Sequence, residues 1–81
     1  MKMRVQFYAQ LRDLTGVQTL DVDLAEEAKV SDLLENLYAK FPSLRDRDNG
    51  ILVGVGVEFV DRNYELRPSD SIAIMPPVQG G

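Results

Sequence analysis

The sequence predicts a two-layer α+β domain, in which one main helix packs on one face of a mixed β-sheet. Stretches near both ends of the chain alternate between apolar and polar residues, as half-buried strands do. One central stretch instead repeats apolar residues at helical spacing. The chain has 81 residues, which suits one small domain. Packing the helix on the sheet therefore buries both apolar faces in a single core.

The N-terminal part of the chain predicts an antiparallel hairpin. Residues 3–8 and 17–24 both alternate, and two strands so close in sequence normally pair with each other. The residues expected to face inward are Met3, Val5, Phe7, Leu20, Val22 and Leu24. Between the strands, residues 9–16 predict a compact turn that places two leucines under the sheet. It ends at Gly16, which can adopt positive φ.

Residues 30–41 predict the main helix. Its apolar stripe consists of Val30, Leu33, Leu34, Leu37, Tyr38 and Phe41. Ser31 and Asp32 lie in or just before the first turn, where short polar side chains bind free N–H groups. Pro42 ends the helix because it pushes the residue before it out of the helical conformation. Residues 43–50 then mix opposite charges and predict a solvated loop that ends in an Asn-Gly turn.

The second half of the chain predicts three strands. Residues 51–57 are apolar on both faces, as in a strand covered on one side and partly shielded on the other. Residues 58–60 predict a short return strand, and residues 71–75 predict the last strand, with Ile72 and Ile74 facing the helix. The two glycines within residues 51–57 lack the third glycine and the following helix of a phosphate-binding loop. They are better explained by a close backbone approach or a bulge.

The first and last strands predict how the sheet is arranged. Both are strongly apolar on one face, so we expect both at the centre of the sheet, parallel to each other. This is the β-grasp, or ubiquitin-like, arrangement. Residues 1–75 would form the domain, and residues 76–81 an extended tail that leaves the end of a central strand.

The composition argues against several classes of function. The net charge of 9 − 13 = −4 argues against nucleic acid or an anionic membrane as the main partner. The chain contains no cysteine and no histidine, so disulfides, thiol nucleophiles and the usual zinc ligands are absent, and we expect no metal site. The remaining polar residues show no nucleophile–base pattern, so we expect no catalysis by the chain alone. The N-terminus does not predict a signal peptide, and no apolar run reaches about 20 residues, so a cytoplasmic protein is expected.

The last six residues form an uncharged tail with two prolines and two glycines. Pro76 and Pro77 have no backbone N–H, so they end the strand ladder and hold the tail extended. Gly80 and Gly81 have no Cβ and fit a channel too narrow for other residues. At about 3.3–3.6 Å per residue, the tail reaches at most roughly 20 Å. It suits delivery of a carboxylate at Gly81 into another protein's active site, although a frayed chain end is the simpler alternative.

Two segments of the chain resemble the molybdopterin synthase small-subunit family. Residues 7–16, FYAQLRDLTG, resemble its first strand and turn, and residues 70–81, DSIAIMPPVQGG, resemble its last strand and tail. The resemblance covers nearly the whole chain, and Pro-Pro-Val-x-Gly-Gly is its most specific part. Gly56 departs from the family, which more often has asparagine before that turn.

The resemblance implies a sulfur carrier that binds no cofactor itself. An activating enzyme, using ATP and magnesium, would adenylate Gly81, and a persulfide sulfur donor would convert it to a thiocarboxylate. The large subunit of molybdopterin synthase would supply the catalytic groups and transfer the sulfur to a cyclic pterin phosphate, in a heterotetramer. A dithiolene contains two sulfur atoms, so two deliveries are expected. Gly80 would provide steric clearance, Val78 and Gln79 would contact the partner, and the two prolines would reduce the ordering entropy of insertion.

Three other functions are open at this point. A thiamine-pathway sulfur carrier would use the same chemistry with another acceptor, but such carriers are usually shorter and lack the Pro-Pro pair. A ubiquitin-like modifier would join Gly81 to a lysine through an isopeptide bond. A plain interaction module would work without Gly81. The candidate docking residues are Phe7, Arg12, Ala73 and Met75, of which the last two would form an apolar patch beside the tail.

Overall fold

The computed structural model describes residues 1–77 as a five-stranded sheet with helices packed against it. In chain order the elements are β1 (Lys2–Phe7), α1 (Gln10–Thr15), β2 (Thr19–Asp23), α2 (Val30–Lys40), α3 (Pro42–Arg45), a 3₁₀ turn (Asp48–Gly50), β3 (Leu52–Val55), β4 (Glu58–Val60) and β5 (Ile72–Met75). The predictions made for Val78, Gln79, Gly80 and Gly81 lie outside the described residues.

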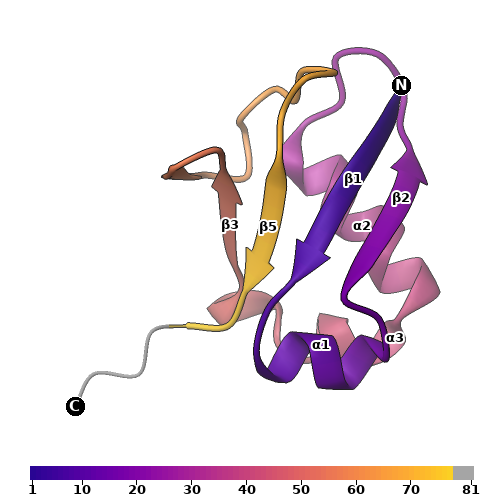
Figure 1. Cartoon of the computed structure of the whole chain (residues 1–81), viewed down its shortest axis with the longest axis vertical. Coiled ribbons are helices and arrows are strands. Elements are labelled where there is room, and N and C mark those ends of the chain that lie inside the picture. Colours follow the sequence, from indigo (N-terminus) through magenta and orange to yellow (C-terminus); the bar gives the residue numbers. More distant parts are fainter. Residues whose placement is uncertain (78–81) are drawn as a thin grey trace.

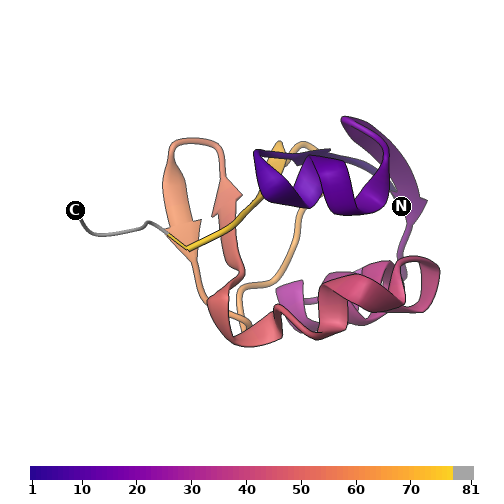
Figure 2. The same cartoon turned by 90° about the horizontal axis from the view of Figure 1, so that it is seen from below.

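The strand order is β2-β1-β5-β3-β4, so the first and last strands are neighbours in the interior of the sheet. β1 and β5 are parallel, with Val5 opposite Ile72, whereas β1–β2, β3–β5 and β3–β4 are antiparallel. α2 lies behind β1 and β2 in Figure 1, and the edge-on view of Figure 2 shows α2 and α3 together in a second layer. The predicted β-grasp arrangement is confirmed.

The core lies between the inner face of the sheet and α2. The inward residues predicted for the sheet are Met3, Val5, Phe7, Val22, Leu24, Ile72 and Ile74, all at most 8% exposed, and Leu20, which is half-buried. The predicted stripe of α2 is buried from Val30 to Tyr38. Since each large apolar side chain removed from water stabilises the fold by about 1.5–3 kcal/mol, this contact supplies most of the driving force for folding.

The ends of α2 also agree with the sequence. The Lys29 N–H donates to the Asp32 carboxylate at 2.9 Å, so an acidic side chain binds a free donor where the helix dipole favours negative charge. At the other end, the Phe41 N–H donates to the Leu37 carbonyl at 2.8 Å. Pro42 then starts α3, because a proline at the first helical position loses no hydrogen bond.

Three predicted loops or strand ends differ from the structure. Residues 10–15 form the short helix α1, not only a turn, although Gly16 ends it with φ 76° as expected. Leu11 is buried, whereas Leu14 is only half-buried. Residues 43–50 were expected as a solvated loop but contain α3 and the 3₁₀ turn, because Leu44 is fully buried and holds the backbone against the core.

Val57 lies in the turn between β3 and β4, not in a strand. Gly56 adopts φ 62° there, a conformation that glycine takes without strain, and Val57 is fully exposed. Gly54 is different, because it lies within β3 and a Cβ there would crowd the end of the Met75 side chain. The turn accounts for Gly56, whereas Gly54 is packed against a side chain and, within residues 1–77, shows no close approach of another backbone.

Candidate functional site

The tail begins at the end of β5, a strand enclosed by β1 and β3. Met75 is opposite Leu52 of β3, and the Ile74 carbonyl accepts a hydrogen bond from the Tyr8 N–H at 3.1 Å. Pro76 and Pro77 follow and offer no N–H to either neighbouring strand. The chain therefore leaves the sheet at the end where α1 also lies (Figure 1).

The sheet face turned away from α2, called the outer face here, has two halves of different polarity. One row of residues crosses all five strands in register: Phe59, Gly54, Ala73, Gln6 and Thr19. The apolar half, over β3, β4 and β5, consists of Leu52, Val57, Phe59, Ala73 and Met75. The polar half, over β1 and β2, consists of Lys2, Arg4, Gln6, Thr19, Asp21 and Asp23.

A shallow depression of about 120 Å³ lies in the apolar half. Apolar residues and glycines line most of it, and Glu58 is the charged residue among them: the lining is Gly54, Gly56, Val57, Glu58, Phe59, Ala73 and Met75. A Cβ at Gly54 would lie 3.2 Å from Met75 Cε. Because glycine has no Cβ, the end of the Met75 side chain can pack against β3 at this point. Phe59 is 62% exposed and Val57 is fully exposed. Exposed apolar side chains grouped in this way are typical of a surface that another protein covers.

The candidate docking residues lie in three different environments. Ala73 and Met75 are half-buried and line the depression, directly before the tail. Arg12 is exposed on α1. Phe7 does not reach the surface, because it is 1% exposed and packs edge-to-face on Phe41 with ring centroids 6.0 Å apart. Phe7 is therefore a core residue, and its inclusion among the docking residues was wrong.

Sequence reasoning missed the most exposed residues of this surface. The sequence predicts a short return strand around Phe59 but not which way its side chain faces. Val60 packs against the core, and strand alternation therefore places Phe59 on the outward side. Tyr8 is 41% exposed beside the same face, and its hydroxyl donates to Gln6 at 2.8 Å. The alternation of residues 3–8 correctly places Tyr8 on the outward face with Arg4 and Gln6, although not as a docking residue, whereas the exposure of Val57 depends on the turn at Gly56.

The first residues of the tail also touch the 3₁₀ turn before β3. A Cβ built on Gly50 would lie 3.1 Å from Pro77 Cγ and 3.2 Å from Pro77 Cδ, so the proline ring rests on the bare Cα of Gly50. The sequence predicted an Asn-Gly turn at this place but contained no signal for a contact with a residue so far along the chain.

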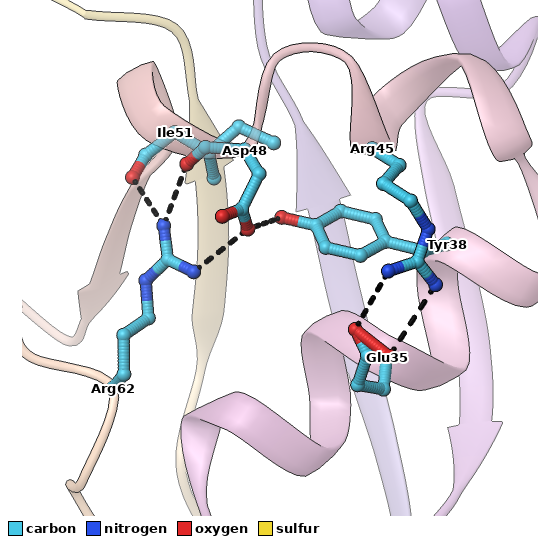
Figure 3. Close-up of polar contacts among 6 residues, drawn as sticks. All are labelled: Glu35, Tyr38, Arg45, Asp48, Ile51 and Arg62. Carbon is cyan, nitrogen blue, oxygen red and sulfur yellow. Dashed lines mark hydrogen bonds and ion pairs between the residues drawn. The ribbon is translucent and has the colours of Figure 1, made fainter.

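Hydrogen bonds hold this turn from two sides (Figure 3). Arg62 donates to the Asp48 carboxylate at 2.9 Å, to the Asp48 carbonyl at 2.8 Å and to the Ile51 carbonyl at 3.4 Å. The Tyr38 hydroxyl donates to the same carboxylate from α2. Arg45 lies over the Tyr38 ring, 5.1 Å from its centroid. The turn is therefore linked to α2 through Tyr38 and to the segment after β4 through Arg62.

These contacts shift the pKa of Asp48 and the pKa of Tyr38 in opposite directions, as expected when a phenol donates a hydrogen bond to a carboxylate. The hydrogen bond from Tyr38, followed by that from Arg62, lowers the pKa of the Asp48 carboxyl below its usual range. Burial, followed by the hydrogen bond to Asp48, raises the pKa of the Tyr38 phenol. At neutral pH the carboxylate stays charged and the phenol stays neutral, so the network remains intact.

Within residues 1–77, no three acidic side chains lie close enough together to hold a metal ion. In the same part of the chain, no helix combines the length and the apolar character needed to cross a membrane.

Comparison with known proteins places the chain in a family. The model described as the ThiS family matches residues 5–81, nearly the whole chain. The chain belongs to the ThiS family. This ThiS-family chain is 31% identical to the molybdopterin synthase sulfur carrier subunit of Homo sapiens, over 99% of this chain and 94% of that protein. The resemblance noted in the sequence is confirmed.

Two solved structures share the fold of this ThiS-family chain. A protein from Pyrococcus furiosus, proposed to be subunit 1 of a molybdopterin converting factor, has a TM-score of 0.86 and 28% identity, with 96% of this chain and 99% of that chain covered. Small archaeal modifier protein 1 from Haloferax volcanii has a TM-score of 0.86 and 29% identity, with both chains fully covered.

Proposed function

We propose that this chain is the sulfur carrier subunit of a molybdopterin synthase. Gly81 would be adenylated by an activating enzyme that uses ATP and magnesium, converted to a thiocarboxylate, and inserted into the large subunit. There the sulfur would pass to a cyclic pterin phosphate, and two carriers would supply the two sulfur atoms of one dithiolene. The observation that most supports the proposal is that the family match continues through residue 81, where this chemistry would take place.

The proposed chemistry needs an activated carbonyl because a carboxylate has no good leaving group. Adenylation makes AMP the leaving group and releases pyrophosphate. The terminal sulfur of a persulfide then attacks the carbonyl carbon and displaces AMP, and a thiol reduces the resulting acyl disulfide to the thiocarboxylate. The chain contains no cysteine, so its only place to hold the sulfur is a terminal carbonyl. It would act as a donor, with the catalytic groups on its partners, in the cytoplasm where ATP is available.

The apolar half of the outer face is the proposed docking surface for the large subunit. It lies beside Pro76, so a partner that covers it is in reach of the tail. Phe59 supplies an exposed aromatic ring and Ala73 has only a small side chain in the same depression, which suits an aromatic or aliphatic side chain of the partner. Arg12 on α1 would contact the partner at the rim, where a charged side chain keeps much of its hydration.

Intact mass spectrometry tests the proposed chemistry. After incubation with the cognate activating enzyme, ATP and a persulfide donor, we expect a mass shift equal to one oxygen replaced by sulfur. Deletion of Gly81, or addition of one residue after it, should abolish the shift, because the activated carbonyl is then missing or displaced. Thr19→Ala in the polar half is the matched control and should be loaded like the wild type. An unshifted wild-type mass with an enzyme that is active on another carrier would contradict the proposal.

A second candidate function is that of a protein modifier. It is favoured by the similarity to a small archaeal modifier protein across the full length of both chains. In that case the activated Gly81 would react with a lysine amine of a target protein. A ladder of high-mass conjugates in cell extracts, lost on deletion of Gly81, would support this use. A separate experiment tests a thiamine-pathway acceptor. The thiocarboxylate form of the chain is supplied to the molybdopterin and thiamine acceptor systems in turn, and transfer of sulfur to each is measured.

A further inference from the structure

We propose that Gly50 is a positioning residue that sets the direction in which the tail leaves the domain, through its contact with Pro77. The inference rests on the proposed function, in which the tail must enter the sites of its partners. The 3₁₀ turn that contains Gly50 would thus help the tail to enter a partner's site, although this turn belongs neither to β5 nor to the outer face.

The contact is so close that a residue with a Cβ at this position would not leave it unchanged. Gly50 does not adopt positive φ, so its backbone conformation is open to other residues. What another residue would change is the space above the Cα, because a Cβ would lie 3.1 Å from Pro77 Cγ and 3.2 Å from Pro77 Cδ. Both are closer than ordinary van der Waals contacts, and the proline ring is closed and cannot move aside by rotating a side-chain bond.

The turn that carries Gly50 is held firmly enough to direct the tail. Its first residue, Asp48, is bound through its carboxylate by Arg62 and Tyr38 and through its carbonyl by Arg62. The Gly50 N–H donates to the Arg47 carbonyl at 2.9 Å, which closes the turn. Anchors on α2 and on the segment after β4 therefore restrain the turn from two directions (Figure 3).

The two prolines transmit this restraint along the chain. Each fixes its own φ near −65°, and Pro77 also keeps Pro76 extended. Once Pro77 rests on Gly50, the path of the chain between Met75 and Pro77 is defined. A tail that starts in a defined direction loses less conformational entropy when it enters a partner, and this favours binding without any new contact to the partner.

Gly50→Ala separates this role from a role in folding. Alanine fits the backbone of the turn, so the thermal midpoint of unfolding should stay close to that of the wild type. The added methyl group should shift Pro77 by a few tenths of an ångström and so change the direction of the chain from Met75 to Pro77. For adenylation by the cognate activating enzyme, we expect KM for the carrier to rise by about three- to tenfold while kcat stays within about twofold, because the terminal chemistry is unchanged once the tail is bound. Asn49→Ala, at the exposed neighbouring position, is the matched control and should leave both constants unchanged.

A double-mutant cycle with Pro77→Ala decides whether the contact is responsible. This second substitution removes Cγ and Cδ of the ring, and the remaining Cβ lies 3.7 Å from the position of a Cβ on Gly50, an ordinary contact. Gly50→Ala should therefore raise KM when Pro77 is present, and change it less than about twofold in a chain that already carries Pro77→Ala. An equal rise in both backgrounds, or no rise in the first, would overturn the proposal.

An NMR measurement that does not depend on function distinguishes failure of this inference from failure of the proposed function. Nuclear Overhauser effects between Gly50 Hα and the Pro77 ring protons are expected in the wild-type chain, and effects between residue 50 and this ring should change in intensity in Gly50→Ala. Their absence from the wild type would overturn the contact, whatever the chain does. If they are present but the wild-type chain is not adenylated, the proposed function is wrong and the delivery role of Gly50 falls with it.

Discussion

The two halves of the outer sheet face lie on different strands of one sheet and differ in polarity. In both, outward residues alternate with inward residues along each strand. Over β1 and β2 the outward residues are charged or polar, and Arg4 and Asp21 form an ion pair at 3.0 Å. Over β3, β4 and β5 the outward residues are apolar or glycine, and the largest, Phe59, is 62% exposed. The buried residues of the sheet are apolar in both halves, so the core does not account for this difference.

The comparison indicates that only part of the face is suited to a partner. The polar half is stable in water without a cover, whereas the apolar half leaves Val57 and Phe59 in solvent. The apolar half is also the one next to Pro76 and Pro77. We therefore expect the apolar half, next to the tail, to bind the partner and the polar half, away from the tail, to stay in solvent. The variants below test this difference.

The largest expected effect comes from placing the same charge at opposite ends of one row of residues. Phe59→Asp and Thr19→Asp both introduce an aspartate at an exposed position on an edge strand, in the row that crosses all five strands. Phe59→Asp should weaken binding to the large subunit by about tenfold or more, or about 1.4 kcal/mol, because it removes an aromatic anchor and buries a charge. Thr19→Asp should change the dissociation constant by less than about twofold.

Isothermal titration calorimetry with the purified large subunit measures both constants. Equal losses of affinity for the two variants would show that the halves do not differ in function. An unchanged dissociation constant for Phe59→Asp would place the docking surface elsewhere on the domain.

An intermediate effect on stability is expected from the charged contact beside the tail. The Asp48 side chain is 41% exposed and binds both Arg62 and Tyr38. After allowance for solvent screening, Asp48→Asn should lower the free energy of unfolding by about 1 kcal/mol at neutral pH. Chemical denaturation of both proteins at a series of pH values measures this difference.

The sign of the pH dependence follows from the lowered pKa of Asp48. The folded state favours the charged carboxylate, so its stabilising contribution is complete above the unfolded pKa of about 3.9 and is lost as the pH falls through the lower folded pKa. The stability difference between wild type and Asp48→Asn should therefore shrink in acid. A difference that stays constant or grows as the pH falls would show that Asp48 acts mainly through its shape.

The smallest effect is expected from the ion pair of the polar half. The side chains of Arg4 and Asp21 are 72% and 47% exposed, and the hydrogen bond from Arg4 lowers the pKa of Asp21. Water and salt screen such a pair, so Asp21→Asn should barely move the thermal midpoint in moderate salt. A clear loss of stability that persists at high salt would show that the polar half is more strongly organised than its exposure suggests.

Local patterns in the sequence predict the main elements and the order in which they pack. Period-2 alternation in residues 3–8, 17–24 and 71–75 and the helical stripe of residues 30–41 are local patterns that record which side of each element is buried. A core formed by one helix and one sheet leaves few ways to combine them, so the parallel pairing of the first and last strands could also be predicted.

Tertiary structure decided what depends on residues far apart in the chain. The short helices α1 and α3 form where burial of Leu11 and Leu44 outweighs weak local preferences. Phe7 and Phe59 are both phenylalanines, yet Phe7 packs on Phe41 in the core, whereas Phe59 lies largely in solvent. The contact between Gly50 and Pro77 forms because β3 and β5 pair antiparallel, which brings the residues before one strand beside the residues after the other. The residues around each position contain no pattern that indicates this pairing.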